Sequence, residues 1–535
     1  MTFDYVIVGG GSAGCVLAAR LAEDPGVSVA LIEAGDANER ILNRVPVGAA
    51  VHIVNRNRCN WAFATVPQRE LNGRIGYQPR GRGLGGSSAI NAMVYLRGQP
   101  QDYDGWAAAG AAGWSWAELL PYFKRSENNE RGADDWHGVG GPLNVADLRS
   151  PNAFDRIFVE AAQQAGLPFN SDFNGATQEG AGPYQVTQNN GERWSAARAY
   201  LGPARERPNL ALLTQALARR IVCEDGRAVA VEIDRGGSVE RVQAAREVIV
   251  SAGALQSPQL LLLSGIGPAA HLREVGVPVV ADVPGVGANL QDHLDIVVNR
   301  RVDSTDLLGL SLTGGAKLVG QIGRWRRERR GTLTSNFAEA GAFARSAPDV
   351  ARPDIQLHFV VGMVDNHNRS FHLGHGMSCH ACGLRPASRG SVRLASADAR
   401  AAPLIDPGFL TAEKDMDVLV HGFKLVRRIF AQPAFAPWGG ADTSRELHFT
   451  DVASDDEIRA AIRAHADTIY HPVGTCKMGD VARDPLAVVD PQLRVRGVAG
   501  LRVVDASVMP TLVSGNTNAP VMAMAERAAE LIRGG

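Results

Sequence analysis

The sequence predicts an α/β fold with a parallel β-α-β unit at its N-terminus and a second α+β part built on an antiparallel sheet. A short β-branched apolar run at residues 5–8 predicts a buried strand; a glycine-rich segment follows, and residues 16–22 have helical character. A second apolar run, residues 27–32, predicts the next strand. Further along, residues 354–360 and 390–394 alternate in polarity, which predicts strands of the second sheet.

The glycines after the first strand predict a dinucleotide site. Gly9, Gly11 and Gly14 form the pattern G-x-G-x-x-G between strand and helix. The first permits a tight turn, the second lets a pyrophosphate approach the backbone, and the third lets the helix pack on the strand. Glu33 follows about 20 residues later, where a ribose-binding acid is expected. The motif alone does not separate NAD from FAD.

Composition excludes several classes of protein. The chain has 535 residues, 55 Lys plus Arg and 56 Asp plus Glu, so the formal charge of −1 argues against a nucleic-acid binder. No signal peptide and no stretch long enough to span a bilayer is recognisable, so a cytoplasmic location is expected. Six cysteines are too few for a disulfide scaffold. Cys379 and Cys382 form a C-x-x-C without a second ligand pair, so we expect buried thiols and no metal site.

Further motifs follow the dinucleotide site. They lie at residues 79–98, 253–268, 470–479, 503–510 and 515–520. In this order they resemble the glucose–methanol–choline (GMC) family of FAD-dependent oxidoreductases, over essentially the whole chain. Within the family the sequence is most similar to bacterial choline dehydrogenases and to the flavin alcohol dehydrogenases of alkane degradation. The segment 253–268 is interpreted as a helix that begins after Ser257-Pro258, with the proline in its first turn.

The resemblance implies FAD as the cofactor, in an FAD-binding Rossmann-like domain. The residues expected to bind it are Gly9, Gly11, Ser12, Ala13, Gly14, Glu33, Ala34, Trp61, Leu84, Gly86, Asn91, Ala92, Met93, Val94, Ala218, Asp505, Ala506, Thr517 and Asn518. Some family members attach FAD covalently through a histidine in the second motif. That position corresponds to Ile90, which cannot form the bond, so the FAD is expected to be non-covalent.

Two catalytic residues are expected from the C-terminal motifs. Oxidation of an alcohol removes a proton from O–H and a hydride from C–H, and the family carries out the second transfer to flavin N5. The resemblance assigns the general base to His471, a residue type whose pKa suits proton transfer. It assigns Asn516 to a hydrogen bond with the alcohol oxygen in the transition state. A final helix is expected to start at Pro520, with its positive end at the flavin.

The expected domains are discontinuous. Residues 1–155, 203–298 and 466–535 would form the FAD-binding domain, and residues 156–202 and 299–465 the substrate-binding domain, whose sheet would lie over the flavin. Residues 324–330 carry five arginines and Trp325. This segment is either a solvated helix end or a contact with an anionic membrane, where basic residues and an aromatic can dock.

The resulting prediction is an alcohol dehydrogenase that oxidises a primary alcohol to the aldehyde and passes electrons to a quinone or another acceptor. The small-molecule substrate itself cannot be identified from the sequence, although an aliphatic or aromatic alcohol is favoured over choline. The alternatives are an oxidase that reduces O2 to H2O2, a choline dehydrogenase, and an FAD-containing lyase without redox turnover. Peripheral contact with the inner membrane would suit the leading prediction.

Overall fold

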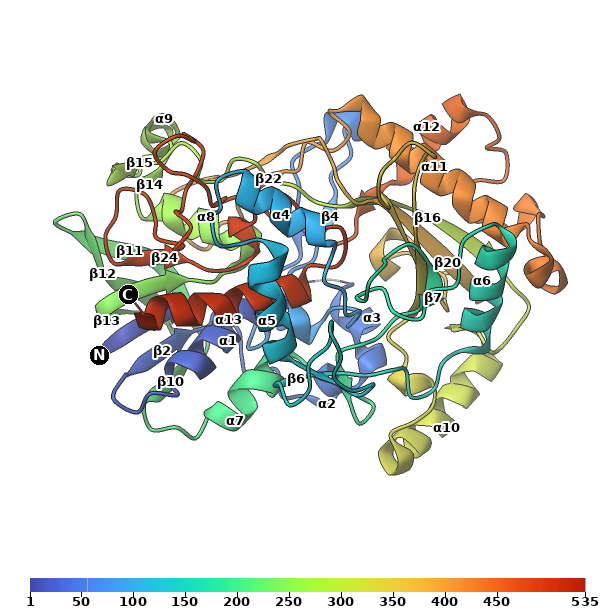
Figure 1. The fold of residues 1–535 in the computed structure, drawn as a ribbon, viewed down its shortest axis with the longest axis horizontal. Helices are drawn as coiled ribbons and strands as arrows, with labels where there is room; N and C mark the ends of the chain where they lie inside the picture. Colours follow the sequence, from blue (N-terminus) through green and yellow to red (C-terminus); the bar gives the residue numbers. More distant parts are fainter. Residues whose placement is uncertain (55, 535) are drawn as a thin grey trace.

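Two large β-sheets organise the chain, one on each side of the view in Figure 1. The computed structural model describes residues 1–54 and 56–534. Both termini lie at the outer end of the first sheet, on the left in Figure 1. None of the helices in these residues is long and apolar enough to cross a bilayer.

The first sheet contains the predicted parallel unit. Its strands are β1 (Thr2–Val8), β2 (Val29–Ile32), β10 (Leu210–Leu213), β11 (Ala216–Glu224), β12 (Arg227–Arg235), β13 (Ser238–Val250) and β24 (Leu501–Val503). The order is β10-β2-β1-β13-β12-β11, and β24 also pairs with β13. Strands β10, β2, β1, β24 and the second half of β13 run parallel, whereas β12 and β11 form an antiparallel extension. The strands predicted at 5–8 and 27–32 are confirmed.

Three helices pack together beside this sheet: α1 (Ser12–Leu21), α5 (Trp116–Ser126) and α13 (Asn518–Gly534). The fully buried Glu526 of α13 pairs with Arg20 of α1 at 2.8 Å and accepts a hydrogen bond from Tyr200 Oη at 2.8 Å. Breaking a buried pair by removing one partner typically costs about 3–5 kcal/mol, so this contact holds the two helices in register. The final helix begins two residues before Pro520.

The second sheet is antiparallel, as predicted. Its strands are β7 (Gly180–Pro183), β16 (Leu294–Arg301), β17 (Gly309–Leu310), β18 (Ala338–Ala344), β19 (Ile355–Val360), β20 (Gly374–Gly383) and β23 (Asp467–Thr468). The order is β23-β16-β20-β19-β18-β7, with β17 pairing β20. Helices α6 (Ala153–Gln164), α11 (Glu413–Phe430) and α12 (Asp455–His465) share its hydrophobic core.

Alternation along β19 gives this sheet two different faces. Ile355, Leu357 and Phe359 pack into the core shared with the helices. Gln356 and His358 therefore point to the opposite face, because successive side chains of a strand alternate. Both are buried nevertheless.

The remaining elements are short, except for one long helix. They are α2 (Ile41–Arg44), α3 (Ala49–His52), α4 (Pro100–Ala108), α7 (Gly202–Ala204), α8 (Gly253–Leu263), α9 (Ala269–Glu274), α10 (Leu312–Glu328), β3 (Phe63–Ala64), β4 (Tyr77–Gln78), β5 (Glu127–Asn129), β6 (Leu143–Val145), β8 (Gln188–Asn189), β9 (Glu192–Arg193), β14 (Ile266–Gly267), β15 (Ala281–Asp282), β21 (Ser391–Arg393) and β22 (Leu404–Asp406). The long helix, α10, projects from the second sheet's side of the molecule at the lower right of Figure 1.

Two sequence-based predictions about elements are wrong. The strand predicted at 390–394 forms β21, but it pairs with β22 in a separate two-stranded ribbon. The helix predicted to begin after Pro258 begins at Gly253, so the proline lies inside α8. Proline has no N–H to donate to the carbonyl four residues earlier. That carbonyl, of Ala254, instead accepts a hydrogen bond from Thr475 Oγ1 at 2.6 Å.

The expected domain boundaries only partly follow the sheets. The boundary at residue 298 falls inside β16, which belongs wholly to the second sheet. Strand β23, expected in the FAD-binding domain, pairs with β16. Cys379 and Cys382 both lie buried in β20, three residues apart and therefore on opposite faces of the strand, so they do not form one site.

Candidate active site

One cavity of about 360 Å³ is lined by residues of both sheets. The wall is formed by the ends of β1 and β2 and the starts of α1 and α13, and by residues of β18 and β19 from the second sheet. Nearly all the residues predicted from the sequence line it: Gly9, Gly11, Ser12, Ala13, Glu33, Ala34, Trp61, Gly86, Asn91, Ala92, Met93, Val94, Ala218, His471, Asp505, Ala506, Asn516, Thr517 and Asn518. Ile90 lines it as well.

Two predicted residues lie behind the cavity wall. A Cβ at Gly14 would lie 1.9 Å from the carbonyl oxygen of Gly9, so only glycine allows the first turn and the helix to approach this closely. Leu84 is buried, and a Cβ at Gly10 would lie 2.9 Å from its Cδ2 atom. Both residues therefore shape the wall from behind.

The wall at the cofactor end is bare backbone. Gly9 has φ +105°, and a Cβ there would lie 2.4 Å from the carbonyl oxygen of Ser251. Gly86, from the second glycine-rich segment, has φ +50°, and a Cβ there would lie 2.7 Å from Cα of Gly11. The two glycine-rich segments thus touch through backbone atoms, which leaves room for a flat or extended cofactor beside them.

Glu33 connects the two glycine-rich segments through hydrogen bonds to their backbone. Its carboxylate accepts hydrogen bonds from the backbone N–H groups of Gly10 at 2.9 Å, Gly35 at 2.7 Å and Gly83 at 2.9 Å. Oε1 accepts two of these hydrogen bonds and Oε2 accepts one, so Oε2 keeps one lone pair for a ribose hydroxyl. Glu33 therefore fixes the loop geometry and still lines the cavity.

Two helix N-termini meet at the cavity. Ser12 Oγ, at the start of α1, donates a hydrogen bond to Asn518 Oδ1, at the start of α13, at 2.7 Å. Free N–H groups and the helix dipoles favour an anion such as a diphosphate at such a place. Among the described residues, three cavity-lining polar atoms are buried without a hydrogen-bond partner: Ser251 Oγ, Asn336 Oδ1 and His358 Nδ1. Glycine walls, helix ends and unpaired polar atoms together fit FAD.

The other end of the cavity holds the predicted catalytic pair. Asn516 Nδ2 lies 3.1 Å from Nε2 of His471. Asn516 Oδ1 accepts a hydrogen bond from Gln356 Nε2 at 3.1 Å, and His358 Nε2 lies 3.4 Å from the same oxygen. The amide is therefore oriented with its N–H groups toward His471. The structure brings both predicted residues together at one point.

A chain of hydrogen bonds determines which nitrogen of His471 carries the proton. His293 Nε2 lies 3.0 Å from the carbonyl oxygen of Leu384, which can only accept, so Nε2 carries the proton of His293. Nδ1 of neutral His293 must then accept from Nδ1 of His471, 3.0 Å away. The remaining nitrogen of His471, Nε2, is left unprotonated, and its lone pair accepts a hydrogen bond from Asn516 Nδ2 at 3.1 Å. This is the protonation state that a general base needs.

Burial keeps the three histidines neutral. Desolvation lowers the pKa of His471 well below 6.5, and the neighbouring His293 and His358 lower it further. Desolvation also lowers the pKa of His293 to about 4 and that of His358 to about 3. Asp292 accepts the backbone N–H of His471 at 2.8 Å, and burial raises the pKa of Asp292 to about 6.

The sequence-based site lacked His293, Gln356, His358 and Asp292. A signal for two of them was present, because Gln356 and His358 alternate with apolar residues in a strand predicted to belong to the sheet over the flavin. The segment containing Asp292 and His293 carried no comparable signal. His293 lies 178 residues before His471 in the sequence, so the contact between their imidazoles could not be inferred from spacing.

Comparisons with known proteins identify the family of the chain. Residues 3–295 and 386–525 match the N-terminal and C-terminal models of the GMC oxidoreductase family. An "Alcohol dehydrogenase [acceptor]" from Pseudomonas putida is 46% identical over 534 residues, covering 99% of this chain and 95% of that protein. An "Oxygen-dependent choline dehydrogenase" from Brucella anthropi is 44% identical, covering 100% and 96%. The crystal structure of pyridoxine 4-oxidase from Mesorbium loti has a TM-score of 0.88 at 34% identity, covering 100% and 99%.

The fold, the glycine-walled cavity and these matches define an FAD-dependent oxidoreductase. The chain belongs to the GMC oxidoreductase family.

Proposed function

We propose that the protein oxidises a primary alcohol to the aldehyde, with His471 as the general base. Like its relatives, the enzyme acts on the CH–OH group of a donor, and bound FAD supplies the hydride acceptor. The observation that carries the proposal is the unprotonated Nε2 of His471, whose tautomer follows from the contact with His293 and whose lone pair faces Asn516. The hydroxyl proton passes to that nitrogen. Asn516 Nδ2 donates a hydrogen bond to the oxygen as negative charge develops there.

An uncharged alcohol is proposed rather than choline, because the carboxylates that line the cavity among the described residues are engaged by the backbone. A quaternary ammonium group is recognised by an aromatic cage or a carboxylate. Among the described residues, the only carboxylates that line the cavity are Glu33 and Asp505, and both accept backbone N–H groups at the cofactor end. The lining of the cavity also includes five apolar side chains: Val94, Phe337, Val360, Val364 and Ile469. An aliphatic or aromatic alcohol suits this wall.

Anaerobic flavin reduction by an alcohol panel tests the proposal. Rapid bleaching with primary aliphatic or aromatic alcohols and slow bleaching with choline is the expected result. In His471→Ala, FAD should stay bound and bleaching should slow by about 10²–10⁴-fold, the usual effect of losing a general base. His421→Ala, an exposed histidine of α11, is the control. Flavin that no alcohol bleaches would favour the lyase alternative and contradict the proposal.

The electron acceptor is proposed to be a membrane quinone, because α10 forms a surface suited to a lipid bilayer. Of this helix only Trp325 is buried. The side chains of Leu312 and Val319 are 96% and 70% exposed, and their spacing of seven residues puts them on one stripe of the helix. Exposed apolar residues at this density are typical of an interaction surface.

Neighbouring residues extend this apolar surface. Leu310, just before α10, forms a bridge with Leu373, which is 79% exposed, and Phe371 is 71% exposed. Arg326 and Arg327 lie exposed in the last turn of the helix. Apolar side chains beside arginines fit the boundary between acyl chains and anionic headgroups.

Trp325 does not take part in this surface, contrary to the expectation from the sequence. It is buried, its Nε1–H donates to the carbonyl oxygen of Gly191 at 2.9 Å, and the Arg329 guanidinium lies 4.2 Å from the ring centre. The tryptophan therefore anchors α10 to the protein. Leucine, valine and phenylalanine would contact the lipid instead.

Sedimentation with vesicles tests the membrane contact. The protein should bind phosphatidylglycerol-containing vesicles, bind pure phosphatidylcholine less, and dissociate in salt, because each basic residue near an anionic surface contributes about 1 kcal/mol. Leu312→Ser with Val319→Ser, and Arg326→Glu with Arg327→Glu, should each weaken binding. Val239→Ser with Arg235→Glu, on the first sheet, is the matched control. Unchanged binding in the α10 variants would reject the surface.

The acceptor and the compartment are tested with the same protein. An oxygen electrode should record slow peroxide formation with alcohol, and a soluble quinone should reoxidise the flavin much faster. Rapid peroxide formation would mean an oxidase.

We propose a cytoplasmic enzyme at the periphery of the inner membrane. Cell fractionation at low and high salt would test that location.

A further inference from the structure

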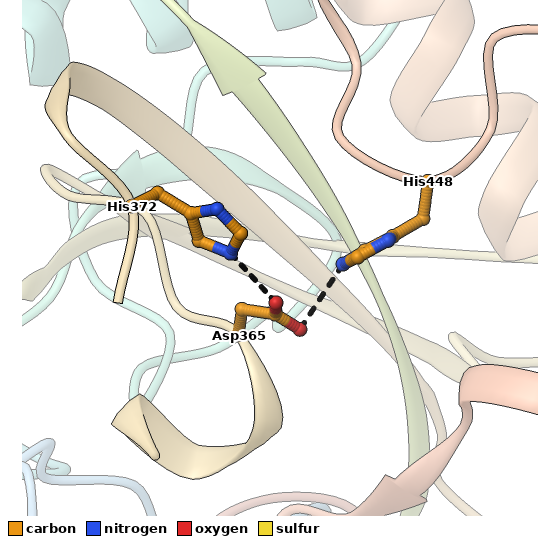
Figure 2. Close-up of side chains that lie close together, drawn as sticks. All are labelled: Asp365, His372 and His448. Carbon is orange, nitrogen blue, oxygen red and sulfur yellow. Dashed lines mark hydrogen bonds and ion pairs between the residues drawn. The ribbon is translucent and has the colours of Figure 1, made fainter. Parts of the chain in front are cut away.

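A carboxylate lies between two imidazoles beside the connection from β19 to β20 in the second sheet (Figure 2). Oδ2 of Asp365 lies 2.7 Å from Nε2 of His372, and Oδ1 lies 3.1 Å from Nε2 of His448. All three ligand atoms lie within 4.8 Å of one another. The group is only partly buried, so water can reach it.

The three residues come from two segments of the chain. Asp365 and His372 lie in the connection between β19 and β20, and His448 lies in the loop before α12. Within the described residues, the carboxylate of Asp365 has no ion pair with lysine or arginine, and its only such partners are the two histidines. A positive charge that would compete with a cation is therefore absent from its immediate contacts.

We propose that Asp365, His372 and His448 bind one divalent transition-metal ion, with Zn²⁺ as the best-suited ion. Two imidazole nitrogens and one carboxylate oxygen are ligands that Zn²⁺ takes in proteins, with water in the fourth position. On binding, each neutral imidazole moves its proton from Nε2 to Nδ1, so that the Nε2 lone pair faces the ion. This differs from the expectation of no metal site, which rested on the lack of a second ligand pair beside Cys379 and Cys382.

The ion would fasten a strained segment over the active-site cavity. Asn366, His367 and Asn368 have φ values of 45°, 57° and 60°, and backbone in this region is costly for non-glycine residues. Asn368 lines the cavity, and Nδ1 of His367 lies 2.7 Å from the hydroxyl of Tyr470. This consequence rests on the proposed function, whereas binding of the ion does not.

Titration of the holoenzyme with ZnCl2 after removal of metals by a chelator tests binding directly. Calorimetry should give one ion per chain, and Co²⁺ in place of Zn²⁺ should give the visible absorption of a four- or five-coordinate ion, read as a difference against the flavin spectrum. Asp365→Asn, His372→Gln and His448→Gln should each weaken binding more than about tenfold, as changes around a metal site commonly do. His421→Gln, in the same domain, should bind as the native protein does.

Other outcomes would overturn the proposal. Several weakly bound ions per chain, or equal affinity in Asp365→Asn, would mean adventitious binding. Loss of binding supports the proposal only in a variant that keeps the native FAD spectrum and the native melting temperature without metal. One of the three conservative variants that meets this condition is enough to test the site.

Proteolysis gives a readout independent of activity. Arg369 is exposed within the segment that the ion would fasten. Zn²⁺ should slow cleavage by trypsin after Arg369 in the native protein and leave it unchanged in Asp365→Asn. Equal cleavage of the native protein with and without the ion would reject the fastening role while leaving the titration to decide on binding.

Discussion

Nδ1 of His293 and Nδ1 of His471 lie 3.0 Å apart, and only one of them can carry the shared proton. The carbonyl of Leu384 occupies the other nitrogen of His293, so the proton belongs to His471. A main-chain oxygen therefore sets the tautomer of the proposed base through an intervening imidazole. His293 acts as a positioning residue.

His293→Leu should slow flavin reduction while leaving FAD bound. Nδ1–H of His471 would lose its acceptor, and the imidazole could adopt the other tautomer, whose Nε2 cannot accept a proton. The rate should fall less than in His471→Ala, because the base is still present. Stopped-flow bleaching compares the two variants. A native rate in His293→Leu would show that the tautomer does not depend on this contact.

Activity should persist into acid solution. Burial and two neighbouring histidines lower the pKa of His471 well below 6.5, and a base is active while it is unprotonated. The acid limb of kcat/KM should therefore fall below pH 6.5, the ordinary pKa of histidine. The pH profile with a saturating acceptor measures it. An acid limb above 6.5 would mean that another group, or a raised pKa, controls the reaction.

The FAD should be released by acid or heat. Ile90, at the position that carries the linking histidine in some relatives, is a buried hydrocarbon side chain lining the cavity. The absorbance of the supernatant after precipitation measures release. Yellow colour retained in the washed precipitate would contradict this prediction.

Local patterns predicted residues that line the glycine-walled end of the cavity. The turn at Gly9 and the strand ending in Glu33 depend on neighbouring residues, so their geometry could be inferred from spacing. The catalytic end depends on contacts between distant segments. No spacing rule could pair His293 with His471, and the position of Pro258 inside α8 depends on a hydroxyl of Thr475 more than 200 residues away.

The same limit applies to the surface. The arginines near residue 326 were recognised from composition, but the direction of each side chain was not. Trp325 points inward because Gly191 offers its carbonyl, and the exposed stripe through Val319 follows from that orientation. Side-chain direction on an isolated helix requires knowledge of what the helix packs against.

Asp155→Asn should make the protein more stable at neutral pH. Burial and the adjacent Glu339 carboxylate raise the pKa of Asp155 well above 3.8, and both groups accept the backbone N–H of Asn152. The folded state then binds a proton more tightly than the unfolded state. The free energy of unfolding therefore falls as the pH rises from about 3.8 through the raised pKa.

An asparagine removes this loss, because its amide keeps an acceptor for Asn152 and offers N–H to Glu339. Melting temperatures of the native protein and the variant should diverge as the pH rises from about 5 to 8. Glu160→Gln, an exposed position on the same helix, is the control and should leave the dependence unchanged. Parallel curves for Asp155→Asn and the native protein would contradict the assignment.

Asn516→Ala should slow reduction of the flavin more mildly than His471→Ala. Its Nδ2 lies 3.1 Å from His471 Nε2, so an alcohol oxygen delivering its proton there would also accept from Asn516. One donor aimed at developing negative charge can contribute about 2.7–4 kcal/mol in a dry, preorganised site. Gln356 holds this amide through Oδ1, but Asn516 is only partly buried, so an effect at or below the lower end is expected. Asn516→His, which restores an N–H donor, should keep part of the rate.

Stopped-flow bleaching with protiated and deuterated alcohol should show a large isotope effect in Asn516→Ala, because C–H cleavage then limits the slow step. Bleaching at the native rate with only weaker alcohol binding would mean that Asn516 serves the ground state instead.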